Sequence, residues 1–148
     1  MSNYHAHKTH SNMENIKLIN IAIEAKKKAH TPYSHFNVGA ALLTKDGKVF
    51  TGCNIECSSY GMTLCAERTA LVKAVSEGYH DFEKIAVVGG LNEELNYTTP
   101  CGACRQFLAD FNQKLEVIIG YLEDGELKYK DRKLNELLPE TFQLENKL

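Results

Sequence analysis

The sequence predicts an α/β fold, a three-layer α/β/α sandwich with a mixed and mainly five-stranded sheet. Segments with helical spacing of apolar residues alternate along the chain with short runs rich in β-branched residues. The first two of these runs flank an Asp-Gly pair, which predicts a β-hairpin. Two later strand–helix–strand passages require helices to cover the sheet, and the opening hairpin makes the sheet mixed.

The first helix is expected over residues 12–30. Ser11 and Glu14 have capping-box spacing, and small or apolar residues then recur at helical intervals. A following Thr-Pro pair should end the helix, because proline disfavours helical geometry in the residue before it. The polar, His-containing stretch 1–11 is expected to be a disordered tail or tag. Residues 12–148 are then expected to form a single catalytic domain.

The next two elements are a hairpin and a second helix. Residues 38–43 and 49–55 read as strands on either side of Asp46-Gly47. A helix is expected over residues 66–77, because an apolar stripe recurs there at helical spacing and Gly78 stands where a C-terminal cap is expected.

The second half of the chain predicts the rest of the sheet. The β-branched run 84–90 is expected to be the central, doubly covered strand. Pro100 should open a third helix, whose buried stripe is expected at Cys104, Phe107, Leu108 and Phe111. The remaining elements expected are a buried strand over 115–122, an Asp124-Gly125 turn, a strand over 126–130 and a short helix over 134–138.

Composition excludes several classes of protein. The 148 residues are 43% hydrophobic and 24% charged, with a net charge of −2, as in ordinary globular proteins. No apolar run approaches the roughly 18 residues of a membrane span, so no membrane partner is expected. The charge balance disfavours a nucleic-acid partner. Without a secretory pattern at the N-terminus, we expect a cytoplasmic protein. Its five cysteines then read as ligands, catalysts or core residues.

Three of these cysteines predict a zinc ion. Cys101 and Cys104 flank the start of the third predicted helix, where unpaired backbone N–H groups favour thiolates over thiols. Cys65 stands at the start of the second helix and is the natural third ligand. Three thiolates with one open coordination position describe a catalytic zinc site.

Glu67 heads the buried stripe of the second helix. A buried carboxylate needs a partner or a role in proton transfer, and a zinc-activated water would provide both. Residues 65 and 67 are nearly opposite on an ideal helix, so this requires Cys65 to precede the regular helix. Arg68 has two equally open interpretations: it donates hydrogen bonds to the thiolates, or it is a plain surface arginine.

Together, residues 65–68 and 100–106 (Cys-Ala-Glu-Arg and Pro-Cys-Gly-Ala-Cys-Arg-Gln) resemble the cytidine deaminase family in its small, three-cysteine, homotetrameric form. Segments 36–41, 52–56, 60–61 and 138–142 are also similar, so the resemblance spans nearly everything after residue 13. It implies one zinc ion per subunit. It also implies hydrolysis of cytidine and deoxycytidine to uridine and deoxyuridine with release of ammonia, in pyrimidine salvage. Glu67 would take the proton of the attacking water, pass it to N3 and later help to protonate the leaving amine.

The resemblance also implies the substrate contacts. The backbone of Ala66 would contact the pyrimidine carbonyl edge, and Asn54 and Glu56 would bind the ribose 3′-hydroxyl. Without the resemblance, these two are more simply a turn asparagine and a solvated glutamate at a strand end.

Three aromatic residues complete the implied substrate site. Phe36 would pack beside the base, Tyr60 would lie near the 5′ side of the sugar across a subunit boundary, and Phe142 would reach the site of a neighbouring subunit. An isolated phenylalanine is more often a core residue. Cys57 and Ser58 depart from the usual Asn and Ala of the family.

Other functions remain open. A structural zinc module would use Cys53, Cys57, Cys101 and Cys104, although we expect Cys53 and Cys57 to be small buried residues. A thiol–disulfide oxidoreductase would use Cys101 and Cys104 alone. A deaminase of another aminonucleoside, such as a blasticidin-type antibiotic, would share the zinc motifs.

Overall fold

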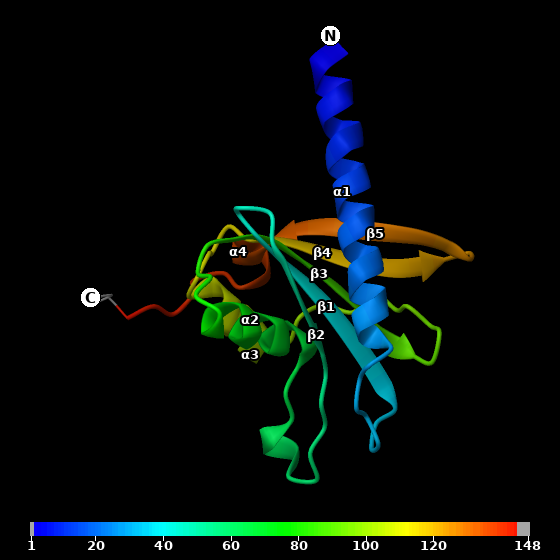
Figure 1. The fold of residues 1–148 in the computed structure, drawn as a ribbon, viewed down its shortest axis with the longest axis vertical. Helices are drawn as coiled ribbons and strands as arrows, with labels where there is room; N and C mark the ends of the chain where they lie inside the picture. Colours follow the sequence, from blue (N-terminus) through cyan, green and yellow to red (C-terminus); the bar gives the residue numbers. More distant parts are fainter. Residues whose placement is uncertain (1, 145–148) are drawn as a thin grey trace.

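The computed structural model describes the backbone of residues 2–144 and the side chains of residues 12–144. Within this part of the chain, one five-stranded sheet has the order β2-β1-β3-β4-β5 (Figure 1). Its strands are β1 (Phe36–Thr44), β2 (Val49–Cys53), β3 (Phe82–Leu91), β4 (Glu116–Glu123) and β5 (Glu126–Lys133). The helices are α1 (Ser2–Lys26), α2 (Ala66–Ser76), α3 (Gly102–Ala109), α4 (Leu134–Leu137) and the short 3₁₀ helix η1 (Tyr60–Met62).

The sheet is mixed, as the sequence predicts. β3 and β4 pair in parallel, while β1 pairs antiparallel with both β2 and β3, and β4 pairs antiparallel with β5. β3 is the central strand and eight of its ten residues are buried, which confirms the prediction of a doubly covered strand.

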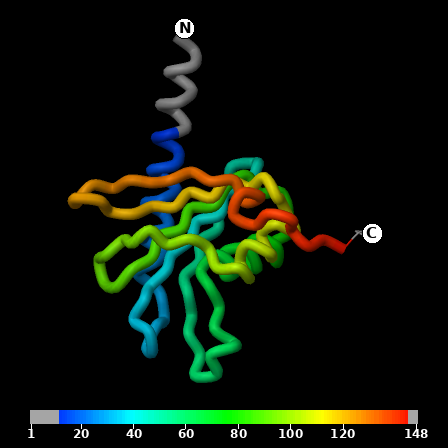
Figure 2. The backbone as a smooth tube through the Cα atoms, turned by 180° about the vertical axis from the view of Figure 1, so that it is seen from behind, coloured from blue at the N-terminus to red at the C-terminus, as the bar shows by residue number. Residues whose placement is uncertain are grey.

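Helices cover both faces of the sheet, which confirms the three-layer sandwich. Because side chains alternate along a strand, neighbouring residues enter different cores. Ala41 and Val88 pack with Ile19 of α1 on one face. Ala40 and Val87 belong to the other core, which contains residues of α2, α3 and α4. Figures 1 and 2 show α1 separated from α2 and α3 by the sheet.

Glycines stand at the turns where the backbone needs left-handed geometry. Asp124 and Gly125 both have positive φ and form a two-residue hairpin loop between β4 and β5. Gly47 (φ 93°) lies in the β1–β2 loop, and Gly78 (φ 93°) follows α2. Both Asp-Gly turns and the helix end at Gly78 are therefore confirmed.

The predicted limits of α1 and β2 are wrong. The first helix begins at Ser2 rather than residue 12, and it ends at Lys26 rather than residue 30. It ends early because the His30 N–H donates to the Asn54 carbonyl, which ties the chain to the segment after β2. β2 ends at Cys53, since Ile55 pairs with Leu64 instead of continuing the hairpin. The boundary of the catalytic domain at residue 12 stays a prediction.

Two further expectations need correction. α3 begins at Gly102 rather than Pro100, and Phe107, expected on its buried stripe, is 40% exposed because it faces away from the sheet. β5 continues to Lys133 instead of ending at Lys130, since its pairing with β4 persists to Glu116. Among the described residues, no helix is both long enough and apolar enough to span a membrane.

The topology places the starts of α2 and α3 at the same edge of the sheet. β2 and β3 run in the same direction because each is antiparallel to β1. α2 follows β2 and α3 follows β3, so both helices begin near the carboxyl ends of these strands. Ligand sites of α/β sheets commonly form at such an edge.

A candidate metal centre and active site

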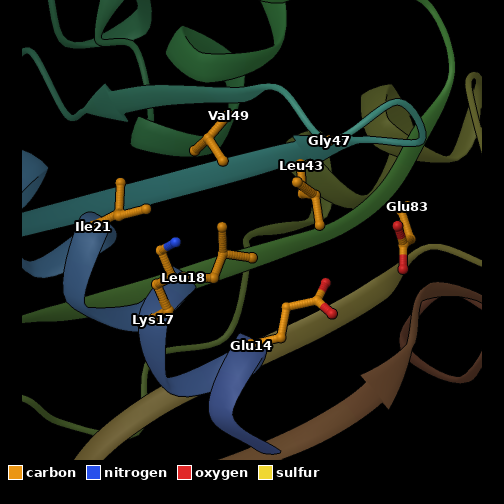
Figure 3. A pocket seen from close by; sticks show the side chains of 8 residues that line it. All are labelled: Glu14, Lys17, Leu18, Ile21, Leu43, Gly47, Val49 and Glu83. Atoms are coloured by element: carbon orange, nitrogen blue, oxygen red, sulfur yellow. The ribbon is translucent and has the colours of Figure 1, made fainter. Parts of the chain in front are cut away.

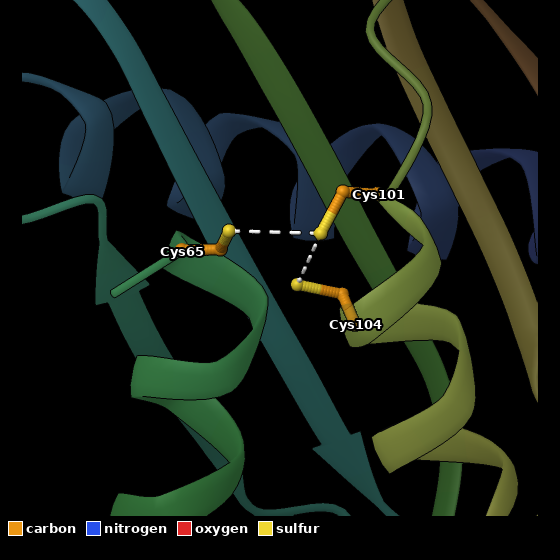
Figure 4. A group of neighbouring side chains, drawn as sticks. All are labelled: Cys65, Cys101 and Cys104. Atoms are coloured by element: carbon orange, nitrogen blue, oxygen red, sulfur yellow. Dashed lines mark hydrogen bonds between the residues drawn. The ribbon is translucent and has the colours of Figure 1, made fainter. Parts of the chain in front are cut away.

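The structure brings together three cysteine sulfurs at the starts of these two helices (Figure 4). The Cys65 Sγ lies 3.7 Å from the Cys101 Sγ, which lies 3.5 Å from the Cys104 Sγ. All three sulfurs are within 4.8 Å of one another, and among residues 12–144 no other group of three or more His, Cys, Asp or Glu side chains has this proximity.

Two of the sulfurs belong to helix N-caps. Cys65 precedes α2 and Cys101 precedes α3, both with extended backbone (φ −72° and −67°). Cys65 therefore precedes the regular helix. This is the condition under which Cys65 and Glu67 can both face the same site. Unpaired N–H groups at both helix starts stabilise thiolates. Cys104 follows one turn into α3 and is fully buried.

The spacing of the sulfurs fits zinc. Tetrahedral ligands at a Zn–S distance of about 2.3 Å lie about 3.8 Å apart. The Cys65–Cys101 and Cys101–Cys104 sulfur–sulfur distances, 3.7 and 3.5 Å, are close to this value. Three cysteines leave one of four tetrahedral positions for water or substrate, as in catalytic rather than structural zinc sites.

Arg68 interacts with the cluster rather than with solvent. Its Nη2 donates to the Cys65 Sγ at 3.4 Å, while its Nε is buried with no hydrogen-bond partner among the described residues. Hydrogen bonding from Cys104, assisted by Arg68, lowers the pKa of Cys65 to about 5. The pKa of Cys104 is raised, because its thiol hydrogen-bonds to Cys65 and is itself buried. The guanidinium thus compensates the negative charge of the sulfurs.

Glu67 lies in the first turn of α2 and is 3% exposed. Burial raises the pKa of its carboxyl to about 7, and the nearby Cys65 charge acts in the same direction, whereas interaction with Cys104 opposes the shift. A buried carboxyl that gains and loses a proton near neutral pH has the properties of a general acid and base.

Asn54 and Glu56 lie just beyond β2 rather than within it, and both bind backbone groups. The Asn54 side chain accepts from the Val38 N–H and donates to the Phe36 carbonyl, each at 2.8 Å. The Glu56 Oε1 accepts from the N–H groups of Tyr33 and Ser34 at 3.1 Å. Hydrogen bonding with Ser34 lowers the pKa of Glu56. Asn54 therefore holds the first residues of β1, and Glu56 holds the segment that leads into them.

The remaining predicted contact residues differ in exposure. Ala66 is fully buried as the first residue of α2. Phe36 opens β1 and its ring lies close to Gly89 of β3. Tyr60, 73% exposed, packs edge to face on Tyr33 with 5.7 Å between ring centroids.

Phe142 lies on the C-terminal segment. Its carbonyl accepts a hydrogen bond from Gln106 Nε2 at 3.0 Å. The residue is 67% exposed, so its ring is available to a second molecule.

The two other cysteines do not join the cluster. Cys53 and Cys57 are half-buried rather than buried as expected, and the sulfur cluster contains Cys65 in their place. This arrangement contradicts the four-cysteine structural module. A thiol–disulfide oxidoreductase would need only Cys101 and Cys104. It would give no role to Cys65 or to the buried Glu67, which both lie beside this pair.

Sequence reasoning missed the part played by Arg105. Its Nε donates to the Pro100 carbonyl and its Nη1 to the Leu137 carbonyl, both at 2.7 Å. It therefore joins the approach to Cys101 with α4. Its place directly after Cys104 was the only available signal.

A separate cavity of about 270 Å³ lies on the opposite face of the sheet, between α1 and the β1–β2 hairpin. Leu18 and Ile21 of α1 and Leu43 and Val49 of the hairpin form its apolar part, with Glu14 and Glu83 at its edge (Figure 3). The metal-centre cysteines do not line this cavity.

Known proteins resemble this chain over most of its length. A family model described as the cytidine and deoxycytidylate deaminase zinc-binding region matches residues 13–120. A probable cytidine deaminase of Dictyostelium discoideum is 49% identical over 130 residues, which cover 88% of this chain and 84% of that protein. A cytidine deaminase of Halalkalibacterium halodurans is 47% identical over 135 residues, covering 90% and 98%.

Solved structures with a similar fold are also cytidine deaminases. The crystal structure of cytidine deaminase from Burkholderia pseudomallei superposes with a TM-score of 0.74 and 46% identity, covering 85% of this chain and 97% of that one. Taken with the sulfur cluster, which is able to hold the metal, these similarities establish that the chain belongs to the zinc-dependent cytidine deaminase family.

Proposed function

We propose that this protein hydrolyses cytidine and deoxycytidine to uridine and deoxyuridine, with release of ammonia. The observation that carries the proposal is the buried carboxyl of Glu67 beside a three-sulfur cluster with room for one further ligand. Membership of the family supports the same reaction.

The proposed zinc ligands are Cys65, Cys101 and Cys104. When bound there, zinc acidifies a water molecule and so supplies hydroxide at neutral pH. Glu67 accepts one water proton and donates it to N3 of the pyrimidine. It then takes the second proton from the new C4 hydroxyl and donates it to the leaving amine, which leaves a C4 carbonyl and releases ammonia. The burial of Glu67 keeps these protons from bulk water, and Arg68 stabilises the charge on Cys65 throughout.

Four residues are proposed to hold the nucleoside. The Ala66 backbone contacts the pyrimidine carbonyl edge, Phe36 packs beside the base, and Asn54 and Glu56 bind the 3′-hydroxyl. For Asn54 and Glu56, a shared location at the start of β1, which Phe36 opens, supports this assignment, because both hold backbone groups within residues 33–38. The Glu56 Oε2 and the second N–H of the Asn54 amide would serve the sugar.

We further propose a homotetramer with active sites at the subunit seams. Tyr60 and Phe142 would extend into the site of a neighbouring copy. Their exposure, 73% and 67%, supports this, as does the exposure of Met62 (73%) beside Tyr60. Large apolar side chains exposed in a group mark interaction surfaces.

A cytoplasmic location and a role in pyrimidine salvage are proposed from the chemistry. The metal centre requires three reduced cysteines, and the reducing cytosol maintains thiols. A hydrolase that converts a free nucleoside to another free nucleoside recovers pyrimidines rather than building them.

Substrate conversion tests the proposed function. The zinc-loaded protein is incubated separately with cytidine, deoxycytidine and a blasticidin-type aminonucleoside, and ammonia and deaminated products are measured. We expect both pyrimidine nucleosides to be converted, and the antibiotic much more slowly. Conversion of the antibiotic alone would transfer the assignment to that substrate class.

A further inference from the structure

Arg105 holds two consecutive backbone carbonyls next to a metal-centre cysteine. Its Nε donates to the Pro100 carbonyl at 2.7 Å, and its backbone N–H donates to the Cys101 carbonyl at 3.0 Å. Pro100 is buried and, as a proline, has no N–H, so its carbonyl is its only backbone hydrogen-bonding group. The backbone bond is the first i→i−4 bond of α3 and does not depend on the side chain, so the Nε bond to Pro100 is the one by which the guanidinium holds the approach to Cys101.

The same guanidinium reaches the C-terminal part of the chain. Its Nη1 donates to the carbonyl of Leu137, the last residue of α4, at 2.7 Å. The next residue of α3, Gln106, donates from Nε2 to the Phe142 carbonyl at 3.0 Å. Figures 1 and 2 show α4 and the following segment beside α3. Two adjacent side chains of α3 thus hold both ends of residues 137–142.

We propose that Arg105 is a positioning residue that couples the metal centre to the C-terminal segment, residues 137–142. It acts through Cys101 on one side and through Leu137 on the other. Retention of the metal and placement of Phe142 then depend on one side chain. The proposal rests on the proposed function only for the use of Phe142 in a substrate site.

The coupling requires the shape of arginine and not only its charge. The Nε and Nη1 groups of a planar guanidinium donate in fixed directions to two acceptors. Lysine carries one compact ammonium on a flexible stem, so it would satisfy one carbonyl at a time. The Pro100 and Leu137 carbonyls, which are 37 residues apart in the chain, would then no longer be held together.

The test compares Arg105→Ala and Arg105→Lys with Arg132→Ala in the full-length, zinc-loaded protein. Arg132 is a matched control because, among residues 12–144, its side chain donates to the carbonyl of its neighbour Asp131 on β5 and to no distant segment. Three readouts need no substrate: the rate of zinc transfer to a chromogenic chelator, amide hydrogen exchange of residues 137–142, and the visible spectrum of the Co²⁺-substituted protein.

We expect zinc release from Arg105→Ala to be about tenfold faster, with faster exchange over residues 137–142 and an altered Co²⁺ spectrum. Arg105→Lys should be intermediate, and Arg132→Ala should match the parent. Gln106→Ala should speed exchange near Phe142 without changing zinc release. If Arg105→Ala does not fold, the lysine variant carries the test.

The coupling is wrong if Arg105→Lys alters neither property, or alters the C-terminal segment while leaving zinc release and the Co²⁺ spectrum at parental values. Failure of the proposed function would look different. A parent protein that binds zinc and shows these effects, yet converts neither cytidine nor deoxycytidine, would retain the positioning role and lose the reaction.

Discussion

At the residue scale, Cys65 and Cys53 are predicted to differ most clearly in whether they bind zinc. Cys65 lies within the sulfur cluster, whereas Cys53 lies at the end of β2 outside it. Cys65→Ala should therefore lose stoichiometric zinc, while Cys53→Ala should keep it. Metal analysis after dialysis measures this. Because imidazole is a common metal ligand and residues 1–11 contain three histidines, both variants are compared after removal of that stretch. Zinc loss from Cys53→Ala instead would restore the four-cysteine module.

Phe142 also belongs to this scale. We expect Phe142→Ala to lower kcat/KM for cytidine about tenfold with unchanged zinc content, because the exposed ring would serve a neighbouring site. Leu144→Ala is the matched control, since Leu144 lies two residues after Phe142 and is 72% exposed. Equal effects of the two substitutions would remove any specific role of Phe142.

Sequence patterns were most informative where function depends on local spacing. Cys65, Glu67, Cys101 and Cys104 could be predicted because helix starts and a buried stripe are local features. The backbone partners of Asn54 could not, because they depend on how residues 36–38 of β1 lie against the chain after β2.

At the element scale, the close approach of β2 to α2 positions the metal centre. A Cβ at Gly52 would lie 2.2 Å from the Ala66 carbonyl oxygen and 2.5 Å from the Ala70 nitrogen, both backbone atoms. Gly52→Ala should displace the start of α2 and lower the free energy of unfolding by about 1–3 kcal/mol. Urea unfolding measures this. Gly61→Ala is the control, because nothing lies within 4 Å of its added Cβ.

A buried lysine holds α1 to the sheet. The side chain of Lys84 in β3 is 5% exposed, and its Nζ donates to Asn15 Oδ1 at 3.1 Å and lies 3.7 Å from the Glu116 carboxylate. Lys84→Ala should cost about 3 kcal/mol of unfolding free energy, because it leaves buried polar groups without their partner. Lys133→Ala, which removes the exposed partner of the same Glu116, should cost less than about 1 kcal/mol. Similar losses would contradict this difference.

The limits of the elements were the least predictable part of the fold. The end of α1 is decided by the bond between His30 and Asn54, which are far apart in sequence. β2 ends at Cys53 because Ile55 pairs with Leu64. The alternation of residues along a strand does not indicate which segment the strand will pair with. The order of helices and strands was predictable because apolar residues recur with different periods in the two kinds of element.

At the scale of the whole molecule, we predict that four copies of the chain assemble. Sedimentation equilibrium should give about four times the 16.6 kDa mass of the chain. The apolar side chains of Tyr60, Met62 and Phe142 would then be covered by other copies. A fully active monomer would contradict active sites at subunit seams, while leaving the metal centre unaffected.

Cytidine hydrolysis by the parent protein and by Glu67→Gln, with zinc content measured in both, tests most directly whether Glu67 transfers the protons of a zinc-dependent deamination. Glu77→Gln serves as the control, because Glu77 is an exposed residue at the end of the same helix. We predict that the parent and Glu77→Gln release equal amounts of uridine and ammonia. Glu67→Gln should retain zinc and lose at least about a thousandfold in kcat. Parental turnover by zinc-loaded Glu67→Gln would contradict the assignment of proton transfer to Glu67.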